Sequence, residues 1–326
     1  MNVFIVATSH NFIQVREAIK YYNLDKKDII LIYMHSRNDE PNLSVVPEGV
    51  KCLTFSYWTT RELITSRHDY RVFASYLQSL KAQCEFFVLF SNFYKSDYVL
   101  IAASILKPSK FVLMDEGTAS IGVVLKRRKN KSHILKCMVK SVLYLRRISI
   151  PRRIVYFSQY LLSINELDTL EQYFFEKEQN VISVDREYAI ILGQPLSEAN
   201  VVNDSYYMKL ISTIYNVLID DGFKRIDYYA HRRESLNKLK KIEALGCVVH
   251  ENKEPFEQVF NKLDPCPSAI YAFYSPILDN LSKKYYSLPE LFMVEIPVND
   301  LICNSAIITE VYKVLKNNQK LNVITL

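Results

Sequence analysis

The feature that most constrains this sequence is an alternation of short apolar runs with longer amphipathic stretches, which occurs twice along its 326 residues. An apolar run suits a strand buried on both faces of a parallel sheet, and an amphipathic stretch suits the helix that covers it. The first series predicts strands at 3–7, 28–33, 50–55, 86–90 and 110–114, and helices at 11–22, 61–83 and 94–105. The second predicts strands at 189–192, 225–230, 247–250 and 268–273, and helices at 205–218, 236–245, 255–262 and 304–316.

Two such series predict an α/β chain with two Rossmann-like domains. We place the N-terminal domain at 1–155, a linker or helical connection at 156–187, and the C-terminal domain at 188–326. Ligands of open parallel sheets bind outside the carboxyl ends of the strands. We therefore expect the two domains to face a cleft that holds the ligand.

Glycine and cysteine usage argues against several classes of protein. The six glycines form neither a G-x-G-x-x-G fingerprint nor a P-loop, which disfavours classical dinucleotide dehydrogenases, P-loop NTPases and protein kinases. The six cysteines are scattered, so we expect no metal site and a reducing compartment. No stretch approaches the ~18 apolar residues of a membrane span, and we expect the protein in the cytoplasm.

The positive charge is concentrated in the segment 126–153, and no acidic residue lies between Glu116 and Glu166. Apolar residues recur there at helical spacing, which predicts a basic amphipathic helix. Such a helix suits an anionic membrane surface, to which each cation contributes about 1 kcal/mol. A core-facing helix with a solvated basic face is the alternative; nucleic acid is disfavoured because base-stacking aromatics are missing. The cations are Lys126, Arg127, Arg128, Lys129, Lys131, Lys136, Lys140, Arg146, Arg147, Arg152 and Arg153.

Two acidic residues and a glycine follow the last strand of the first series. Asp115 and Glu116 stand where a buried strand ends, so they are partly desolvated, as catalytic acids and bases often are. Gly117 allows a sharp turn that presents one carboxylate to the ligand, where it can accept a proton from a hydroxyl. The same residues also suit a helix N-cap or a solvated loop.

Three motifs of the second series have comparable positions. His231, Arg232 and Arg233 follow a strand and suit a phosphate, although an exposed basic turn has the same composition. Glu257 opens a helix, where it can hold ribose hydroxyls or complement the helix dipole. Ser275 follows a strand and can donate its hydroxyl and backbone N–H to a phosphate.

Taken in order, these motifs resemble those of the bacterial sialyltransferases. They look most like the lipooligosaccharide and capsule sialyltransferases of glycosyltransferase family 52, with kinship to the bacterial polysialyltransferases. That group carries a D/E-D/E-G motif, an H-P motif and a late serine motif, matched here by Asp115-Glu116-Gly117, His231-Arg232 and Ser275. The segments 4–10 and 192–198 also look like the family's domain-opening segments.

The resemblance implies a GT-B fold and an inverting, metal-independent transfer from CMP-sialic acid to a glycan hydroxyl, with no cofactor. Asp115 would be the general base, and His231 would stabilise or protonate the departing phosphate. An enzyme of this kind would lie on the inner face of the cytoplasmic membrane, where a lipid-linked acceptor is found. The donor side would comprise Gln194, Pro195, Arg232, Arg233, Glu257 and Ser275, and the acceptor side Thr8, Ser9, His10, Asn11, Glu116 and Gly117.

Two departures from the family pattern affect these assignments. Arg232 stands where the family has proline, so the backbone that fixes His231 differs. Leu196 occupies the place of an acidic residue, and Glu198 two positions on is therefore an alternative base to Asp115.

A second sequence, Asp220-Asp221-Gly222, also fits the D/E-D/E-G pattern. It stands at the end of an expected helix instead of a strand. We interpret it as a helix C-cap, because Gly222 suits the left-handed conformation found there.

Two other functions fit the same residues. One is a GT-B glycosyltransferase with a different nucleotide-sugar donor, which nucleotide titration distinguishes. The other is a non-catalytic protein that binds glycans or membranes, which Arg232 in place of proline favours. The sequence leaves the oligomeric state open.

Overall fold

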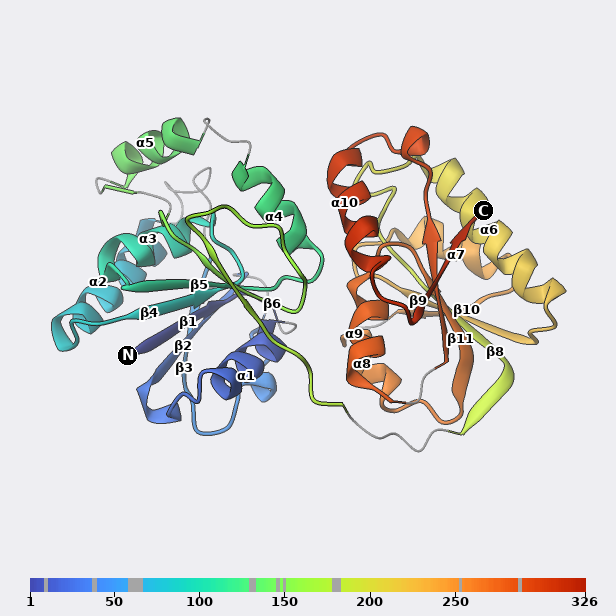
Figure 1. The fold of residues 1–326 in the computed structure, drawn as a ribbon, viewed down its shortest axis with the longest axis horizontal. Coiled ribbons are helices and arrows are strands. Elements are labelled where there is room, and N and C mark those ends of the chain that lie inside the picture. Colours follow the sequence, from blue (N-terminus) through green and yellow to red (C-terminus); the bar gives the residue numbers. More distant parts are fainter. Residues whose placement is uncertain are drawn as a thin grey trace. The chain divides into compact units, whose positions relative to one another are not determined.

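The computed structural model describes residues 1–8, 11–36, 40–57, 67–128, 133–144, 147–148, 151–177, 183–251, 254–286 and 289–326. The chain divides into two compact units, Met1–Tyr173 and Phe174–Leu326. Each unit contains one parallel sheet flanked by helices (Figure 1).

The sheet of the first unit has seven described strands in the order β3-β2-β1-β4-β5-β6-β7, and neighbouring strands are parallel. The strands are β1 Asn2–Val6, β2 Ile29–His35, β3 Lys51–Ser56, β4 Val88–Ser91, β5 Lys110–Met114, β6 Val155–Ser158 and β7 Thr169–Gln172. The helices are α1 Asn11–Tyr21, α2 Arg67–Gln83, α3 Asp97–Leu106, α4 Ala119–Arg128 and α5 His133–Leu143, with 3₁₀ turns η1 Lys26–Asp28 and η2 Leu43–Val45.

The sheet of the second unit has six described strands in the order β10-β9-β8-β11-β12-β13, again parallel. The strands are β8 Val184–Leu192, β9 Arg225–Ala230, β10 Val248–Glu251, β11 Cys266–Ala272, β12 Glu290–Glu295 and β13 Leu321–Thr325. The helices are α6 Asp204–Asp220, α7 Leu236–Glu243, α8 Phe256–Phe260, α9 Pro276–Lys284 and α10 Ser305–Leu315, with the 3₁₀ turn η4 Val298–Asp300.

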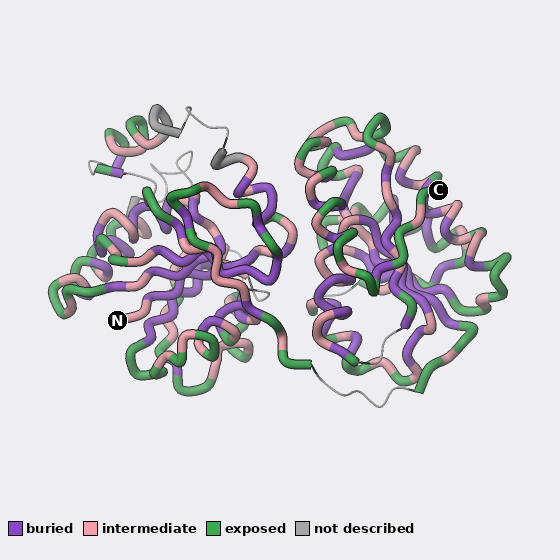
Figure 2. Tube along the Cα trace, viewed as in Figure 1, coloured by how far each residue is buried: buried purple, intermediate pink, exposed green. Residues whose placement is uncertain are grey.

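The inner strands are buried on both faces, which explains why their sequences are apolar runs without alternation. Four of the five residues of β1 and six of the seven of β2 are buried. Phe4 and Phe90 of the neighbouring strands β1 and β4 stack with their ring centroids 4.2 Å apart. Figure 2 shows buried residues gathered along the strands of each unit.

Local capping defines the helices of the second unit. Asn203 precedes α6, and its Oδ1 accepts the N–H of Tyr206 at 2.7 Å. The same helix ends before Gly222, whose φ of +87° is the left-handed conformation that favours glycine. Asp220-Asp221-Gly222 therefore forms a helix terminus, as we interpreted it from the sequence.

Each sheet has a switch point, where the strand order reverses and successive connections pass to opposite faces. It lies between β1 and β4 in the first unit and between β8 and β11 in the second. At a switch point the loops diverge and leave a crevice at the carboxyl ends of the two strands. The switch points therefore indicate where each unit is best suited to bind a ligand.

The boundary between the units differs from our prediction. The expected linker 156–187 contains most of β6 and all of β7, which pair with β5 and with each other. The first unit accordingly extends to Tyr173. The sequence did not predict β7 because Thr-Leu-Glu-Gln lacks an apolar run, and we assigned the apolar residues of β6 to the linker.

Other expected elements agree closely with the structure. The strands expected at 110–114 and 225–230 correspond to β5 and β9 residue for residue. The helix expected at 61–83 corresponds to α2 from Arg67, and 61–66 lie outside the described residues.

The six cysteines are free thiols. Within the described ranges, no helix combines the length and apolar character needed to cross a membrane.

Candidate functional site

Asp115 lies at the carboxyl edge of the first sheet, directly after β5, and is only 1% exposed. Its Oδ2 accepts the backbone N–H of Gln159 at 2.8 Å, and the side chain of Asn92 donates to its carbonyl oxygen. Gln159 follows β6 and Asn92 follows β4, so polar residues after three adjacent strands meet here. The carboxylate therefore bonds to the end of the neighbouring strand.

Two buried amides flank the switch point of the first sheet. Asn11, at the start of α1, accepts the backbone N–H groups of Ala7 and Thr8 through its Oδ1 at 3.2 and 3.0 Å. Its Nδ2 and the Oδ1 of Asn92 are buried and have no hydrogen-bond partner among the described residues. Native proteins rarely leave buried polar atoms unpaired, and a water molecule or a ligand that reaches this edge can supply the partner.

The remaining acceptor-side residues are only partly described. Thr8 and Glu116 are half-buried, and the N–H of Glu116 donates to the hydroxyl of Ser120 at 3.1 Å. Gly117 has a φ of +55°, which provides the turn expected after Asp115. Ser9 and His10 lie outside the described residues.

His231 follows β9 in the second unit, and both its backbone and its ring are hydrogen-bonded. Its Nδ1 accepts the N–H of Arg233 at 3.2 Å, so the proton of the neutral imidazole lies on Nε2. Burial, followed by the positive charges of Arg233 and Arg232, lowers the pKa of the imidazole to about 4. At neutral pH His231 is therefore an uncharged donor of one N–H.

A buried carboxylate fixes the backbone of His231. The Oε2 of Glu234 accepts the His231 N–H at 2.7 Å, while its Oε1 accepts the hydroxyl of Tyr228 at 2.7 Å and pairs with Lys238 at 2.8 Å. Both charged side chains are fully buried, so losing either partner would leave an uncompensated charge. We call these contacts of Glu234 the clamp. The clamp restricts the backbone at His231, as a proline at position 232 would.

Gly193, at the end of β8, makes room for that clamp. A Cβ atom built on Gly193 would lie 2.2 Å from the Oε2 of Glu234 and 2.6 Å from the hydroxyl of Tyr228. Any larger residue would displace the carboxylate that holds His231. Glycine is therefore required at position 193 because Glu234 and Tyr228 lie so close to the backbone, and not because the loop binds a phosphate.

The alternative base, Glu198, belongs to the same charge network. Its Oε2 pairs with Lys238 at 2.8 Å and its Oε1 accepts the N–H of Ser235 at 2.9 Å. Burial opposes ionisation, but the bonds to Lys238 and the Ser235 N–H outweigh it, and the pKa of Glu198 is lowered. A carboxylate so stabilised is a weak proton acceptor, whereas it is well suited to hold the loop that carries His231.

The donor-side residues Gln194, Pro195 and Ser275 lie around the switch point between β8 and β11. The Oε1 of Gln194 accepts the N–H of Phe273, just after β11, at 3.0 Å and so bridges the two strand ends. Pro195 is buried beside it. Ser275 is 3% exposed and caps α9, where its Oγ accepts the N–H of Ile277 at 3.3 Å. The structure thus brings Ser275 and Gln194 to the same edge as His231.

Arg232, Arg233 and Glu257 have different environments. Both arginines are exposed, so their guanidinium groups can reach a ligand. Glu257, in α8 after β10, is 7% exposed, and its Oε1 accepts the side-chain amide of Asn280 in α9 at 2.9 Å. This hydrogen bond joins α8 and α9. It gives Glu257 a structural role that does not depend on the helix dipole.

Sequence reasoning missed several residues of both edges. Asn92 and Gln159 each follow a strand directly, as Asp115 does. The expected strand ended at 90, two residues before Asn92, and β6 was not predicted, so the strand-end rule did not select either residue. The sequence gives no indication that Glu234 and Lys238 are buried, because the two side chains become buried together only when α7 packs against the second unit.

Within the described ranges, no group of three or more His, Cys, Asp or Glu side chains is placed to hold a metal ion. The metal independence expected from the sequence stays a prediction.

Comparison with known proteins shows the fold. No protein-family model and no curated protein sequence matches this chain. The α/β-galactoside α-2,3-sialyltransferase of Photobacterium phosphoreum is 13% identical, with a TM-score of 0.53 over 99% of this chain and 97% of that one. The spinosyn rhamnosyltransferase SpnG is 9% identical, with a TM-score of 0.50 over 100% and 86%. A putative UDP-N-acetylglucosamine 2-epimerase from Listeria monocytogenes is also 9% identical, with a TM-score of 0.53 over 98% and 89%.

At these identities the likeness concerns architecture alone. The predicted class, α/β with two Rossmann-like domains of the GT-B type, is confirmed. Membership of glycosyltransferase family 52 remains a resemblance of short motifs.

The environment of His231 predicts its titration. We expect nitrogen NMR of the intact protein to show an Nε2-protonated imidazole with a pKa of about 4. Since the pKa in the unfolded chain is about 6.5, the unfolded state binds more protons between these values, and stability falls as the pH drops from about 6.5 to about 4. The double variant Arg232→Ala/Arg233→Ala should raise the pKa. A native pKa near 6.5 would contradict this description.

Proposed function

We propose that this chain is a GT-B glycosyltransferase that moves sialic acid from CMP-sialic acid to a hydroxyl of a lipooligosaccharide or capsule glycan, with inversion and without a metal. The observation that carries the proposal is that His231, Arg232, Arg233 and Ser275 lie at the carboxyl edge of the same sheet, after the strands β9 and β11 that flank β8. A neutral N–H donor, two guanidinium groups and a helix N-terminus suit a phosphate. The order of motifs along the chain supports a CMP-sugar as the source of that phosphate.

In this reaction Asp115 accepts the proton of the acceptor hydroxyl. Its burial keeps water away, and its bond from the Gln159 N–H orients the carboxylate. The unpaired amide atoms of Asn11 and Asn92 at the same edge would bind the sugar groups of the acceptor. Glu198 is the weaker candidate for this role because its ion pair with Lys238 lowers its basicity.

On the donor side, binding of the phosphate changes the pKa of the His231 imidazole. The Nε2–H donates to a phosphate oxygen, and the anion offsets the field of Arg232 and Arg233 that disfavours the imidazolium. The pKa of His231 therefore rises when the donor binds, and the ring can pass its proton to the departing CMP. Gln194 and Pro195 would line this side, Ser275 would donate its hydroxyl to the phosphate, and Glu257 would hold the cytidine ribose.

Nucleotide binding separates the alternatives. We expect isothermal titration of the intact protein to show CMP binding at least about tenfold more tightly than UDP or GDP, and His231→Ala to weaken it. Preference for UDP would favour a transferase or epimerase acting on another sugar nucleotide. Binding of none of the three would favour the non-catalytic glycan- or membrane-binding protein.

Catalysis is tested by hydrolysis of CMP-sialic acid, which needs no known acceptor. We expect Asp115→Asn and His231→Ala each to lower the rate roughly 10²–10⁴-fold, the usual contribution of a positioned acid or base. Asp220→Asn is the matched control, since Asp220 has the same sequence pattern but is exposed at the end of α6. Equal rates in all variants would contradict the assignment, and loss of activity on adding a chelator would contradict metal independence.

The basic segment supports a peripheral contact with an anionic membrane. Helix α5 exposes Met138, Val139, Val142 and Leu143, which are between 45% and 73% exposed. Its Lys140 pairs with Asp97 of α3, and the hydroxyl of Tyr144 donates to the same carboxylate at 2.9 Å. These bonds fix the helix while these four apolar side chains face outward, which favours a peripheral contact over a core-facing helix. Lys129, Lys131 and Arg146 lie outside the described residues, as do the side chains of Lys126, Arg127, Arg128 and Lys136.

Vesicle co-sedimentation tests this contact. We expect binding to vesicles of phosphatidylglycerol that weakens with rising salt, and a loss of about tenfold in Met138→Asp/Val142→Asp, because both carboxylates would have to enter the interface. Leu161→Asp is the control, since Leu161 is 74% exposed in the same unit but outside the basic segment. Binding that high salt leaves unchanged would contradict the electrostatic contribution.

A further inference from the structure

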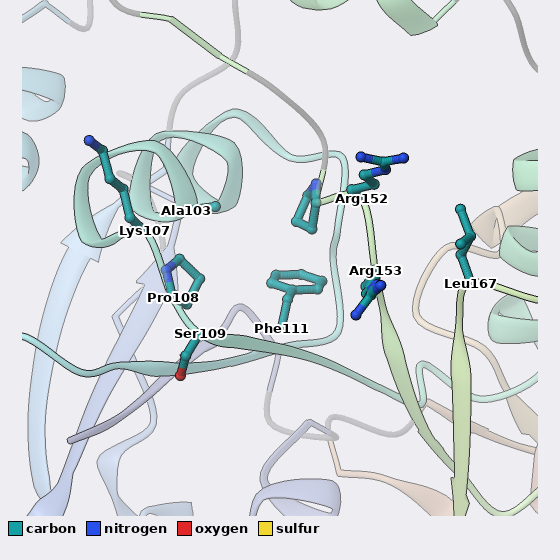
Figure 3. A pocket seen from close by; sticks show the side chains of 9 residues that line it. Ala103, Lys107, Pro108, Ser109, Phe111, Arg152, Arg153 and Leu167 are labelled. Atoms are coloured by element: carbon teal, nitrogen blue, oxygen red, sulfur yellow. The ribbon is translucent and has the colours of Figure 1, made fainter.

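A pocket of about 550 Å³ opens at the amino edge of the first sheet, where β5 and β6 begin (Figure 3). Its wall includes Ser109 and Phe111 around the start of β5, and Arg152 and Arg153 just before β6. Asp115 follows the opposite end of β5. The pocket is therefore separate from the edge to which we assign proton transfer.

Three cations and no acidic residue line this pocket. Lys107, Arg152 and Arg153 are exposed, and none of the lining residues is an aspartate or glutamate. Within the described part of the chain, the ammonium of Lys107 and the guanidinium of Arg153 take part in no ion pair. A concave surface that is lined by positive charges alone concentrates their electrostatic field in the hollow, where it attracts an anion.

The other walls suit a carbon substituent beside that anion. Phe111 is 3% exposed and forms part of the lining together with Pro108 and Pro151. Figure 3 shows Phe111 near the centre, with Lys107 to one side and Arg152 and Arg153 to the other. Guanidinium forks match phosphate oxygens, whereas the aromatic ring and prolines match carbon.

We propose that this pocket binds a phosphoester, with the phosphate held by Arg152 and Arg153, the ester carbons against Phe111, and Lys107 adding positive charge on the other side of the ring. Two sources share this chemistry: the headgroup of an anionic phospholipid and a soluble phosphoester. The surroundings connect the pocket with the lipid. Ala103 of α3 lines it, and the hydroxyl of Ser104 donates to the carbonyl of Arg147 at 2.9 Å, in the chain that follows α5. The helix that anchors the exposed apolar face of α5 thus also forms a wall of the pocket.

Two titrations of the intact protein test the proposal and distinguish the sources. One uses glycerol 3-phosphate, and the other uses vesicles of phosphatidylglycerol compared with phosphatidylcholine. We expect Lys107→Ala/Arg153→Ala to weaken binding of at least one of the two anionic ligands about tenfold. Loss for vesicles identifies the lipid headgroup, and loss for glycerol 3-phosphate alone identifies a soluble ester.

Matched controls exclude a general effect of charge or folding. Lys27→Ala/Lys51→Ala removes two exposed cations of the same unit that do not line the pocket, and it should bind like the wild type. Circular dichroism and an unchanged CMP titration of the pocket variant show that its fold and the proposed donor site are intact. The proposal is wrong if neither anionic ligand binds, if both bind the pocket variant as tightly as the wild type, or if the control variant loses as much.

Discussion

Burial of both faces of two parallel sheets is the constraint on which the placement of every candidate residue depends. Strands such as β1, β2 and β5 are almost entirely buried, so their side chains can only be apolar. Most polar side chains that approach the sheets therefore lie at strand ends, where backbone groups also need partners. Asp227, which is buried inside β9, is an exception that is paired with Arg225 and Tyr188. Asp115 and His231 follow from this rule, since each is the first residue after its strand.

The two carboxyl edges differ in how they hold their polar groups. At the first edge neutral amides and backbone N–H groups surround Asp115, and two amide atoms lack partners among the described residues. At the second edge a buried ion pair of Glu234 and Lys238 holds the loop of His231. The first arrangement suits hydroxyl groups, which donate and accept. At the second edge the loop so held carries the exposed Arg232 and Arg233, which suit an anion. This difference supports the proposal that the first unit binds the acceptor and the second the nucleotide.

At Arg232 the sequence departs from the H-P motif that it otherwise resembles. A proline after the histidine would restrict the backbone, and its absence raised the alternative of a non-catalytic protein. The structure supplies another restraint, because Glu234 accepts the His231 N–H and Glu198 accepts the Ser235 N–H. Arg232 is then free to present a second guanidinium beside Arg233. Arg232 thus adds positive charge where a phosphate is proposed to bind, while Glu234 and Glu198 restrain the backbone.

The sequence by itself determined the fold class, most of the strands and the strand-end positions of Asp115, His231 and Ser275, because burial on both faces produces apolar runs that can be recognised locally. It did not determine α4, β6, β7, α9, β12 or β13, which become regular through pairing and packing against the rest of each unit. It also could not show that Gly193 makes room for Glu234, that Lys238 is buried, or that Lys107, Arg152 and Arg153 line one pocket. Those relations join residues distant in sequence, and only tertiary packing decides which of their side chains come within contact distance.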